Sequence, residues 1–150
     1  MFNVGFVGHG SDKFDARTEL IAKELIYNIL DDTEKVHGVI SMVSGHSPMG
    51  GIDIWAEEIA LSLGILLDLK IPKQQKWDSH YGYKQRNLDI ARSCDTLHVI
   101  LVKNYPENYN GQRFNLCYHC KTSDHVKSGG CWTGKQAKKL GKEVIWHIIE

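Results

Sequence analysis

The chain has 150 residues and a mass of 17.0 kDa, the size of one ordinary domain. Hydrophobic residues make up 42% and charged residues 24% of the chain, which excludes a disordered or low-complexity protein. Eighteen basic residues balance eighteen acidic ones. This neutral charge argues against a nucleic-acid-binding protein. It still allows a small basic pocket that holds one phosphorylated ligand.

Apolar, β-prone runs alternate with segments of helical periodicity along the chain. Strands are predicted at residues 2–7, 36–43, 65–69, 96–102 and 144–149. Helices are predicted at residues 14–30, 52–63, 84–93 and 133–140, and Gly64 and Gly141 end two of them. Residues 72–83 and 103–130 are predicted to be loops.

This β-α-β-α-β-α-β-α-β order predicts an α/β fold in which helices cover both faces of a mostly parallel sheet. The sequence contains no internal repeat and no linker, so we expect a single domain over residues 1–150. In such sheets ligands bind outside the carboxyl ends of the strands. Several clusters of glycine fall at that edge, and they are the main functional signal of the sequence.

The apolar runs are far shorter than a membrane span, and residues 1–4 carry no basic region or cleavage site typical of a signal peptide. We therefore expect a cytoplasmic protein that has no membrane partner.

Two glycine-containing turns each join a strand to a helix. Residues 8–12 (GHGSD) allow backbone N–H groups to approach an anion beside a helix N-terminus, or form a tight turn in which Asp12 caps the helix. Residues 44–53 (SGHSPMGGID) match neither the dinucleotide fingerprint nor a P-loop, but offer backbone donors that suit a phosphate. Asp53 either bonds a ribose hydroxyl or complements the helix dipole alone.

Two later segments add side chains that suit a phosphorylated ligand. In residues 82–87 (GYKQRN), Arg86 clamps a phosphate or remains a solvated surface residue. Trp77, Tyr81 and Tyr83 stack a base or pack the loop down. In residues 129–133 (GGCWT), Thr133 caps a helix or bonds a phosphate oxygen. The candidate ligand-binding residues are Gly8, His9, Gly10, Ser11, Ser44, Gly45, His46, Gly50, Gly51, Asp53, Arg86, Asn87, Gly129, Gly130, Trp132 and Thr133.

Three of the four cysteines lie in one short segment, which in a cytosolic protein suggests a metal rather than disulfides. The spacing C-x2-C-x4-H-x5-C is close to the zinc-knuckle pattern and predicts a structural zinc with no position left for water, although free thiols in a loop are the alternative. His119 competes for the place of fourth ligand, and Cys94 is expected to be a small core residue. The candidate metal ligands are Cys117, Cys120, His125 and Cys131.

In chain order, residues 44–56, the Arg86-Asn87 pair and residues 129–133 resemble the SLOG superfamily. This group of Rossmann-like domains includes lonely-guy phosphoribohydrolases, DNA-processing protein A and YspA-type nucleotide sensors. The resemblance covers nearly the whole chain through short motifs, and residues 77–87 are most similar to the YspA-type branch. The resemblance implies a Rossmann-like three-layer sandwich, to which this chain adds a zinc-knuckle-like insertion at residues 117–131. It also implies a phosphorylated nucleotide or derivative as ligand and a homodimer or higher homo-oligomer.

Two positions depart from the lonely-guy motif Gly-Gly-x-Gly-Thr-x-x-Glu, because Trp132 replaces a loop glycine and Gln136 replaces the acid. An amide cannot act as the carboxylate that N-glycosidic cleavage requires. We therefore expect a binding protein with a sensor or carrier role. The alternative is an N-glycosidase or phosphoribohydrolase that acts on nucleoside monophosphates, in which Asp53, Glu57 or Asp12 replaces the missing acid. Its catalytic candidates are Arg86, Asp53 and Glu57. A nucleic-acid-binding module that uses the zinc knuckle is a third hypothesis, which the balanced charge opposes.

Overall fold

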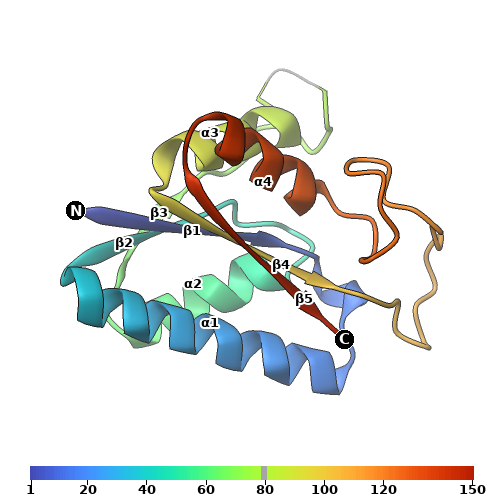
Figure 1. Ribbon diagram of the computed structural model, residues 1–150, viewed down its shortest axis with the longest axis horizontal. Coiled ribbons are helices and arrows are strands. Elements are labelled where there is room, and N and C mark those ends of the chain that lie inside the picture. Colours follow the sequence, from blue (N-terminus) through green and yellow to red (C-terminus); the bar gives the residue numbers. More distant parts are fainter. Residues whose placement is uncertain (79–80) are drawn as a thin grey trace.

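The computed structural model describes residues 1–78 and 81–150. Five strands form one sheet in the order β3-β2-β1-β4-β5, and every neighbouring pair is parallel. Helices α1 (Ala16–His37) and α2 (Ile52–Ser62) cover one face of the sheet, and α3 (Tyr83–Ser93) and α4 (Gly129–Lys139) cover the other (Figure 1). The predicted three-layer α/β fold is thereby confirmed. The strands are β1 (Phe2–Gly8), β2 (Ile40–Ser44), β3 (Leu66–Leu69), β4 (Thr96–Val102) and β5 (Glu143–Ile149).

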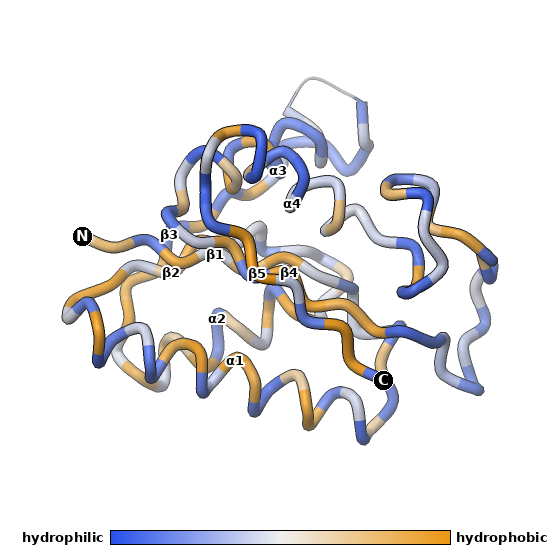
Figure 2. The backbone as a smooth tube through the Cα atoms, viewed as in Figure 1, coloured by the Kyte–Doolittle hydropathy of each residue, from blue (hydrophilic) through white to orange (hydrophobic). Residues whose placement is uncertain are grey.

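The central strands are mostly apolar because helices cover both of their faces, and the buried polar residues of β4, Thr96 and His98, form side-chain hydrogen bonds with Glu143 and His147 of β5. Every residue of β4 is buried, and β1 pairs with it in a register that sets Gly8 beside Ile100. Figure 2 shows this hydrophobic centre between more polar outer segments. The carboxyl ends of β1 and β2 lead into the turns that precede α1 (Ala16–His37) and α2 (Ile52–Ser62). The glycine-containing turns of the sequence therefore lie at one edge of the sheet.

Helix α1 is longer at its C-terminal end than its predicted range of 14–30. Its N-cap is Asp15, which forms a capping box with Thr18, so the expectation that Asp12 caps the helix is wrong. The helix ends at Gly38, whose φ of 78° favours glycine. The predicted strand from residue 36 therefore begins too early, because Val36 belongs to α1 and β2 starts at Ile40. Among the described residues no helix, α1 included, is both long and apolar enough to cross a membrane.

The predicted loop at residues 72–83 includes Ser79 and His80, which lie outside the described residues, and Tyr83 already belongs to α3 (Tyr83–Ser93). The last helix, α4 (Gly129–Lys139), begins four residues before its predicted start at Thr133. Its N-cap is Ser128, whose Oγ accepts a hydrogen bond from the backbone N–H of Gly130 at 2.9 Å, so Thr133 is not the cap. The N-terminus of α4, with its first-turn amides and the positive end of the helix dipole, therefore lies at Gly129 and Gly130.

Candidate functional site

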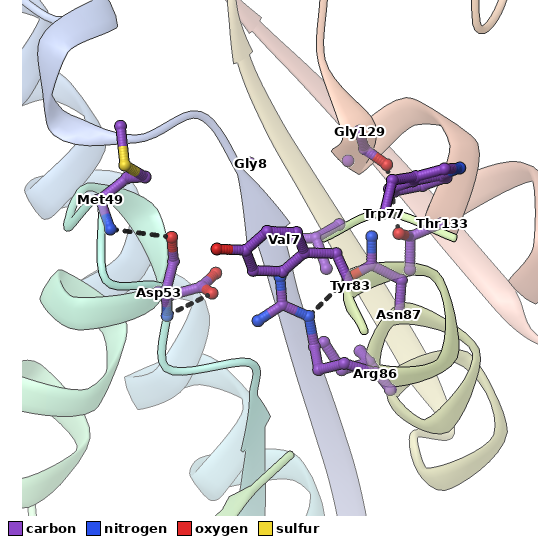
Figure 3. Close-up of a pocket in the computed structure, with 13 residues that line it drawn as sticks. Val7, Gly8, Met49, Asp53, Trp77, Tyr83, Arg86, Asn87, Gly129 and Thr133 are labelled. Carbon is purple, nitrogen blue, oxygen red and sulfur yellow. Dashed lines mark hydrogen bonds between the residues drawn. The ribbon is translucent and has the colours of Figure 1, made fainter. Parts of the chain in front are cut away.

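A cavity of about 340 Å³ lies at the carboxyl edge of the sheet (Figure 3). Its walls come from β1, from the turn before α2, from the loop before α3, and from the N-terminal parts of α2, α3 and α4. Such an edge is where ligands bind in parallel α/β sheets. The lining residues are Val7, Gly8, Ser47, Met49, Asp53, Trp77, Tyr83, Arg86, Asn87, Ile90, Gly129, Gly130 and Thr133.

Arg86 is the cation of this cavity, and neighbouring groups fix its orientation. Its Nη1 donates to the carbonyl oxygen of Gly45 at 2.6 Å, and its Nε donates to Oδ1 of Asn87 at 2.7 Å. The guanidinium also lies 5.2 Å from the ring centroid of Tyr83. A Cβ at Gly45 would collide with this guanidinium, which explains why glycine suits that position. Among the described residues Nη2 has no hydrogen-bond partner, so Arg86 retains donors for a ligand.

Asp53 is the carboxyl group that lines the cavity. It lies in the first turn of α2, is 7% exposed, and accepts a hydrogen bond at Oδ2 from the backbone N–H of Ser47 at 3.1 Å. Burial raises the pKa of Asp53 to about 6, against the opposing effects of Arg86 and the Ser47 amide. Within the described part of the chain its second oxygen makes no hydrogen bond. The cavity therefore contains a carboxyl that titrates near neutral pH.

Glu57, the other carboxylate candidate, lies behind the 44–53 turn and does not line the cavity. Its Oε2 accepts from Oγ of Ser44 at 2.8 Å, and its Oε1 lies 2.6 Å from Nδ1 of His46. These three candidates thus form a polar cluster that holds the turn. The cluster supports the loop that carries Asp53 and is not placed to contact a molecule in the cavity.

Only Gly8 of the first glycine cluster lines the cavity. The ring of His9 is buried; its Nδ1 accepts from the N–H of Val102 at 3.2 Å, and its Nε2 donates to the carbonyl of Val126 at 3.0 Å. Burial lowers the pKa of His9 to about 4, which keeps the ring neutral. His9 therefore connects β4 to the following loop.

The other glycines of the first two turns mediate contacts between the turns themselves. The backbone N–H and Oγ of Ser11 both donate to the carbonyl of Met49, at 3.1 and 3.0 Å. A Cβ at Gly51 would collide with the carbonyl of His9, and one at Gly10 would lie 2.9 Å from Cβ of Met49. Gly50 adopts a positive φ of 71°. The structure places Gly10, Ser11, Gly50 and Gly51 behind the cavity wall.

The start of α4 forms the wall opposite Asp53 (Figure 3). Gly129, Gly130 and Thr133 line the cavity there, and Thr133 Oγ1 donates to the carbonyl of Gly129 at 3.2 Å. Trp132 does not line the cavity, but its ring packs edge-on against Trp77, with centroids 5.1 Å apart. This second aromatic ring therefore supports the one that borders the cavity.

The four predicted metal ligands come together beside α4, and their ligand atoms all lie within 4.8 Å of one another. Sγ of Cys117 is 3.4 Å from Sγ of Cys131, and Sγ of Cys120 is 3.3 Å from Nε2 of His125. The other ring nitrogen of His125 lies 2.8 Å from Oδ1 of Asp124, an arrangement that orients metal-binding histidines in proteins. These residues are close enough to bind a metal ion.

The two remaining residues of the metal prediction lie outside this cluster. His119 packs against the rings of Trp77 and Tyr118, and the histidine that lies close to the three cysteines is His125. Cys94 is fully buried among apolar side chains at the end of α3, as expected for a core residue.

Several lining residues lie outside the ligand-binding set that the sequence predicts. Trp77 and Tyr83, for which the sequence suggests base stacking or loop packing, border the cavity, and the sequence signal for them is their position beside a glycine-containing helix start. Val7, Ser47, Met49 and Ile90 carry no chemical signature, and they line the cavity because of where the turns and helices pack.

No family model matches the chain, and no curated protein matches it. The solved structure of the molybdenum cofactor carrier protein MCP from Chlamydomonas reinhardtii is similar to this chain, with a TM-score of 0.59 and 16% sequence identity. The similarity covers 97% of this chain and 75% of that chain. At this identity the likeness shows a shared Rossmann-like α/β fold.

Proposed function

We propose that this protein binds and releases a phosphorylated nucleotide or nucleotide-derived cofactor in the cavity at the carboxyl edge of its sheet. The observation that carries the proposal is the convergence of the first turns of α2, α3 and α4 on one cavity that also contains Arg86. Helix N-termini carry partial positive charge and free N–H donors, and both favour an anion. The donors left on the guanidinium add a bidentate partner for phosphate.

The charges of the cavity suggest how such a ligand lies in it. A phosphate beside Asp53 would be repelled above the pKa of that carboxyl, whereas the start of α4 has no acidic residue in its first turn. We therefore expect the phosphate between Gly129, Thr133 and Arg86. A hydroxyl or amino donor of the ligand then meets Asp53, and Trp77 and Tyr83 supply aromatic surface for a flat ring system.

A role in carrying or sensing agrees with two further points. The MCP structure, whose fold this chain shares, is that of a molybdenum cofactor carrier protein. The position at which lonely-guy enzymes hold their acid is Gln136, which does not line the cavity. We assign the chain to the SLOG superfamily as part of this proposal.

We also propose that the Cys117, Cys120, His125 and Cys131 cluster binds a structural zinc ion. Three sulfurs and one imidazole nitrogen are a typical tetrahedral zinc donor set, and four protein ligands leave no position for a reacting water.

Calorimetry with paired ligands tests the binding proposal. AMP, GMP, CMP and UMP are each compared with the matching nucleoside, and at least one monophosphate is expected to bind more tightly than its nucleoside. Arg86→Ala should weaken that binding by about 1.5–3 kcal/mol, the range for a hydrogen bond to a charged group. Arg92→Ala, an exposed arginine on the same helix, is the matched control and should bind as the parent does. Equal affinity of the Arg86→Ala protein and the parent would contradict the proposal.

One observation favours a second candidate, an N-glycosidase acting on nucleoside monophosphates. Asp53 faces the cavity and has a pKa raised to about 6, so it can hold or release a proton near neutral pH. Among the candidate acids Asp53 alone lines the cavity, so the enzymatic alternative depends on this residue.

A further inference from the structure

The metal cluster and the ligand cavity share the first turn of α4. Cys131 is the third residue of α4, and Gly129 and Gly130, which begin the helix, line the cavity. The carbonyl of Ser128 accepts a hydrogen bond from the thiol of Cys131 at 3.1 Å, while its Oγ accepts from the N–H of Gly130 at 2.9 Å. Fixing Cys131 on a metal therefore also fixes the backbone that faces the cavity.

A second contact joins the cluster to the opposite side of the cavity mouth. His119, which lies between the first two cysteine ligands, packs against Trp77 with ring centroids 5.7 Å apart. Trp132, which follows Cys131, packs on the same indole. Trp77 itself lines the cavity. A Cβ added at Gly129 would lie 3.6 Å from Cζ3 of the Trp77 ring, so the indole packs close to the start of α4. The aromatic wall thus rests on His119 and Trp132, which adjoin two of the four candidate metal ligands, Cys120 and Cys131.

The segment that carries most of the ligands contains little regular structure. Between β4 and α4, residues 103–128 are all described, and their pairing as strands is limited to one isolated bridge between Cys117 and Thr122. The segment is tied to the sheet through Val126, which pairs with Val102 and His9. Ordering a loop of this length costs conformational entropy, and a metal that joins four of its side chains offsets that cost.

We propose that metal binding at the Cys3His cluster controls the affinity of the cavity for its ligand. This inference rests on the proposed function, and it adds a regulation of that same site. In the metal-bound protein the start of α4 and Trp77 are held in place, so the ligand meets a preformed wall. In the metal-free protein the ligand must order that wall itself and binds less tightly. By linkage, the ligand raises the affinity of the cluster for the metal by the same factor.

The experiment removes zinc from the purified chain with a chelator, restores it by titration with Zn²⁺, and uses inorganic phosphate and AMP as probes. Phosphate binding is followed by phosphorus NMR, and hydrogen exchange is measured at residues 129–133. We expect Zn²⁺ to slow exchange at these amides and to lower the Kd of the probes by about 5- to 150-fold, the usual range of coupling between sites. His125→Ala should lose both effects. His37→Ala, which removes an exposed histidine at the end of α1, should retain both.

Two outcomes separate the possible failures. Equal Kd values with and without Zn²⁺ would overturn the coupling and leave the proposed function standing. Absence of probe binding in both states would overturn the proposed function, and the coupling with it. Because His125→Ala can impair folding, the reversible removal and return of Zn²⁺ in the unaltered chain is the deciding comparison, with far-UV circular dichroism reporting whether the sheet persists.

Discussion

Replacing Asp53 with Asn should stabilise the unliganded protein, because the folded chain holds this carboxyl in an unfavourable environment. Burial raises the pKa of Asp53 from 3.8 to about 6, and the residue is only 7% exposed. A shift of about two pKa units corresponds to about 3 kcal/mol of lost stability when the group is ionised. The raised pKa already includes the attraction of Arg86, and the amide keeps an acceptor for the Ser47 N–H, so we expect a gain of up to about 3 kcal/mol.

The pH dependence of this gain has a definite sign. Below pH 3.8 the carboxyl is protonated in both the folded and the unfolded chain, and Asp53 costs nothing. Between pH 3.8 and about 6 the unfolded chain ionises first, so the cost grows as pH rises. Above about pH 6 the cost is complete. The stability difference between Asp53→Asn and the parent should therefore increase from pH 4 to pH 7 and then remain constant.

Urea unfolding of the two proteins at a series of pH values measures this difference. Asp12→Asn is the matched control, since its half-exposed carboxylate should change stability by less than about 0.5 kcal/mol. The same Asp53→Asn substitution should weaken ligand binding, because a stabilising change at a strained site commonly costs function. An Asp53→Asn protein that is less stable than the parent at pH 7, or a difference that does not change with pH, would refute the reasoning.

Three further predictions concern the metal, the cavity and the chemistry. Protein purified without chelator should contain about one zinc per chain by elemental analysis, and protein without metal would contradict the proposed zinc site. Cys120→Ser should lower Tm, because the free energy of metal binding also stabilises the folded chain. Gly45→Ala should weaken nucleotide binding by about the 1.5–3 kcal/mol expected for loss of Arg86, since the new Cβ displaces the guanidinium, and undiminished affinity by calorimetry would count against it. Incubation with AMP, GMP, CMP and UMP should release little or no free base by chromatography, whereas turnover that disappears in Asp53→Asn would make the protein an N-glycosidase.

The sequence predicted the central strands well because their pattern has one physical cause. The predicted range of β4 equals the observed Thr96–Val102, where continuous burial favours apolar residues and Thr96 and His98 are the polar exceptions. Element ends were less predictable. Val36 is β-branched and suggested a strand, yet it continues α1 as a 76% exposed residue, since the helix ends only at Gly38. The glycine pair at 129–130 suggested a loop, but the Ser128 cap and close packing against Gly8 place it in α4.

The candidate site was predictable in its location and less so in its members. Parallel topology alone brings the glycine turns to one edge, and Arg86 and Asp53 line the cavity there. Glycines that approach a ligand and glycines that approach another turn have the same sequence signature, so Gly51 could not be separated from Gly8. The spacing of the cysteines favoured His125 with His119 as a rival, and only the packing of His119 against Trp77 shows that His125 is the one that lies beside the cysteines.

A crystal structure of the protein grown with a bound monophosphate, or with a ligand that remains through purification, would show directly whether the cavity is the binding site. We expect electron density for the phosphate between Arg86, Thr133 and the first amides of α4, with the rest of the ligand between Trp77 or Tyr83 and Asp53. Density at another place, such as the hollow between α1 and β5 that His98 and Glu143 line, would contradict it.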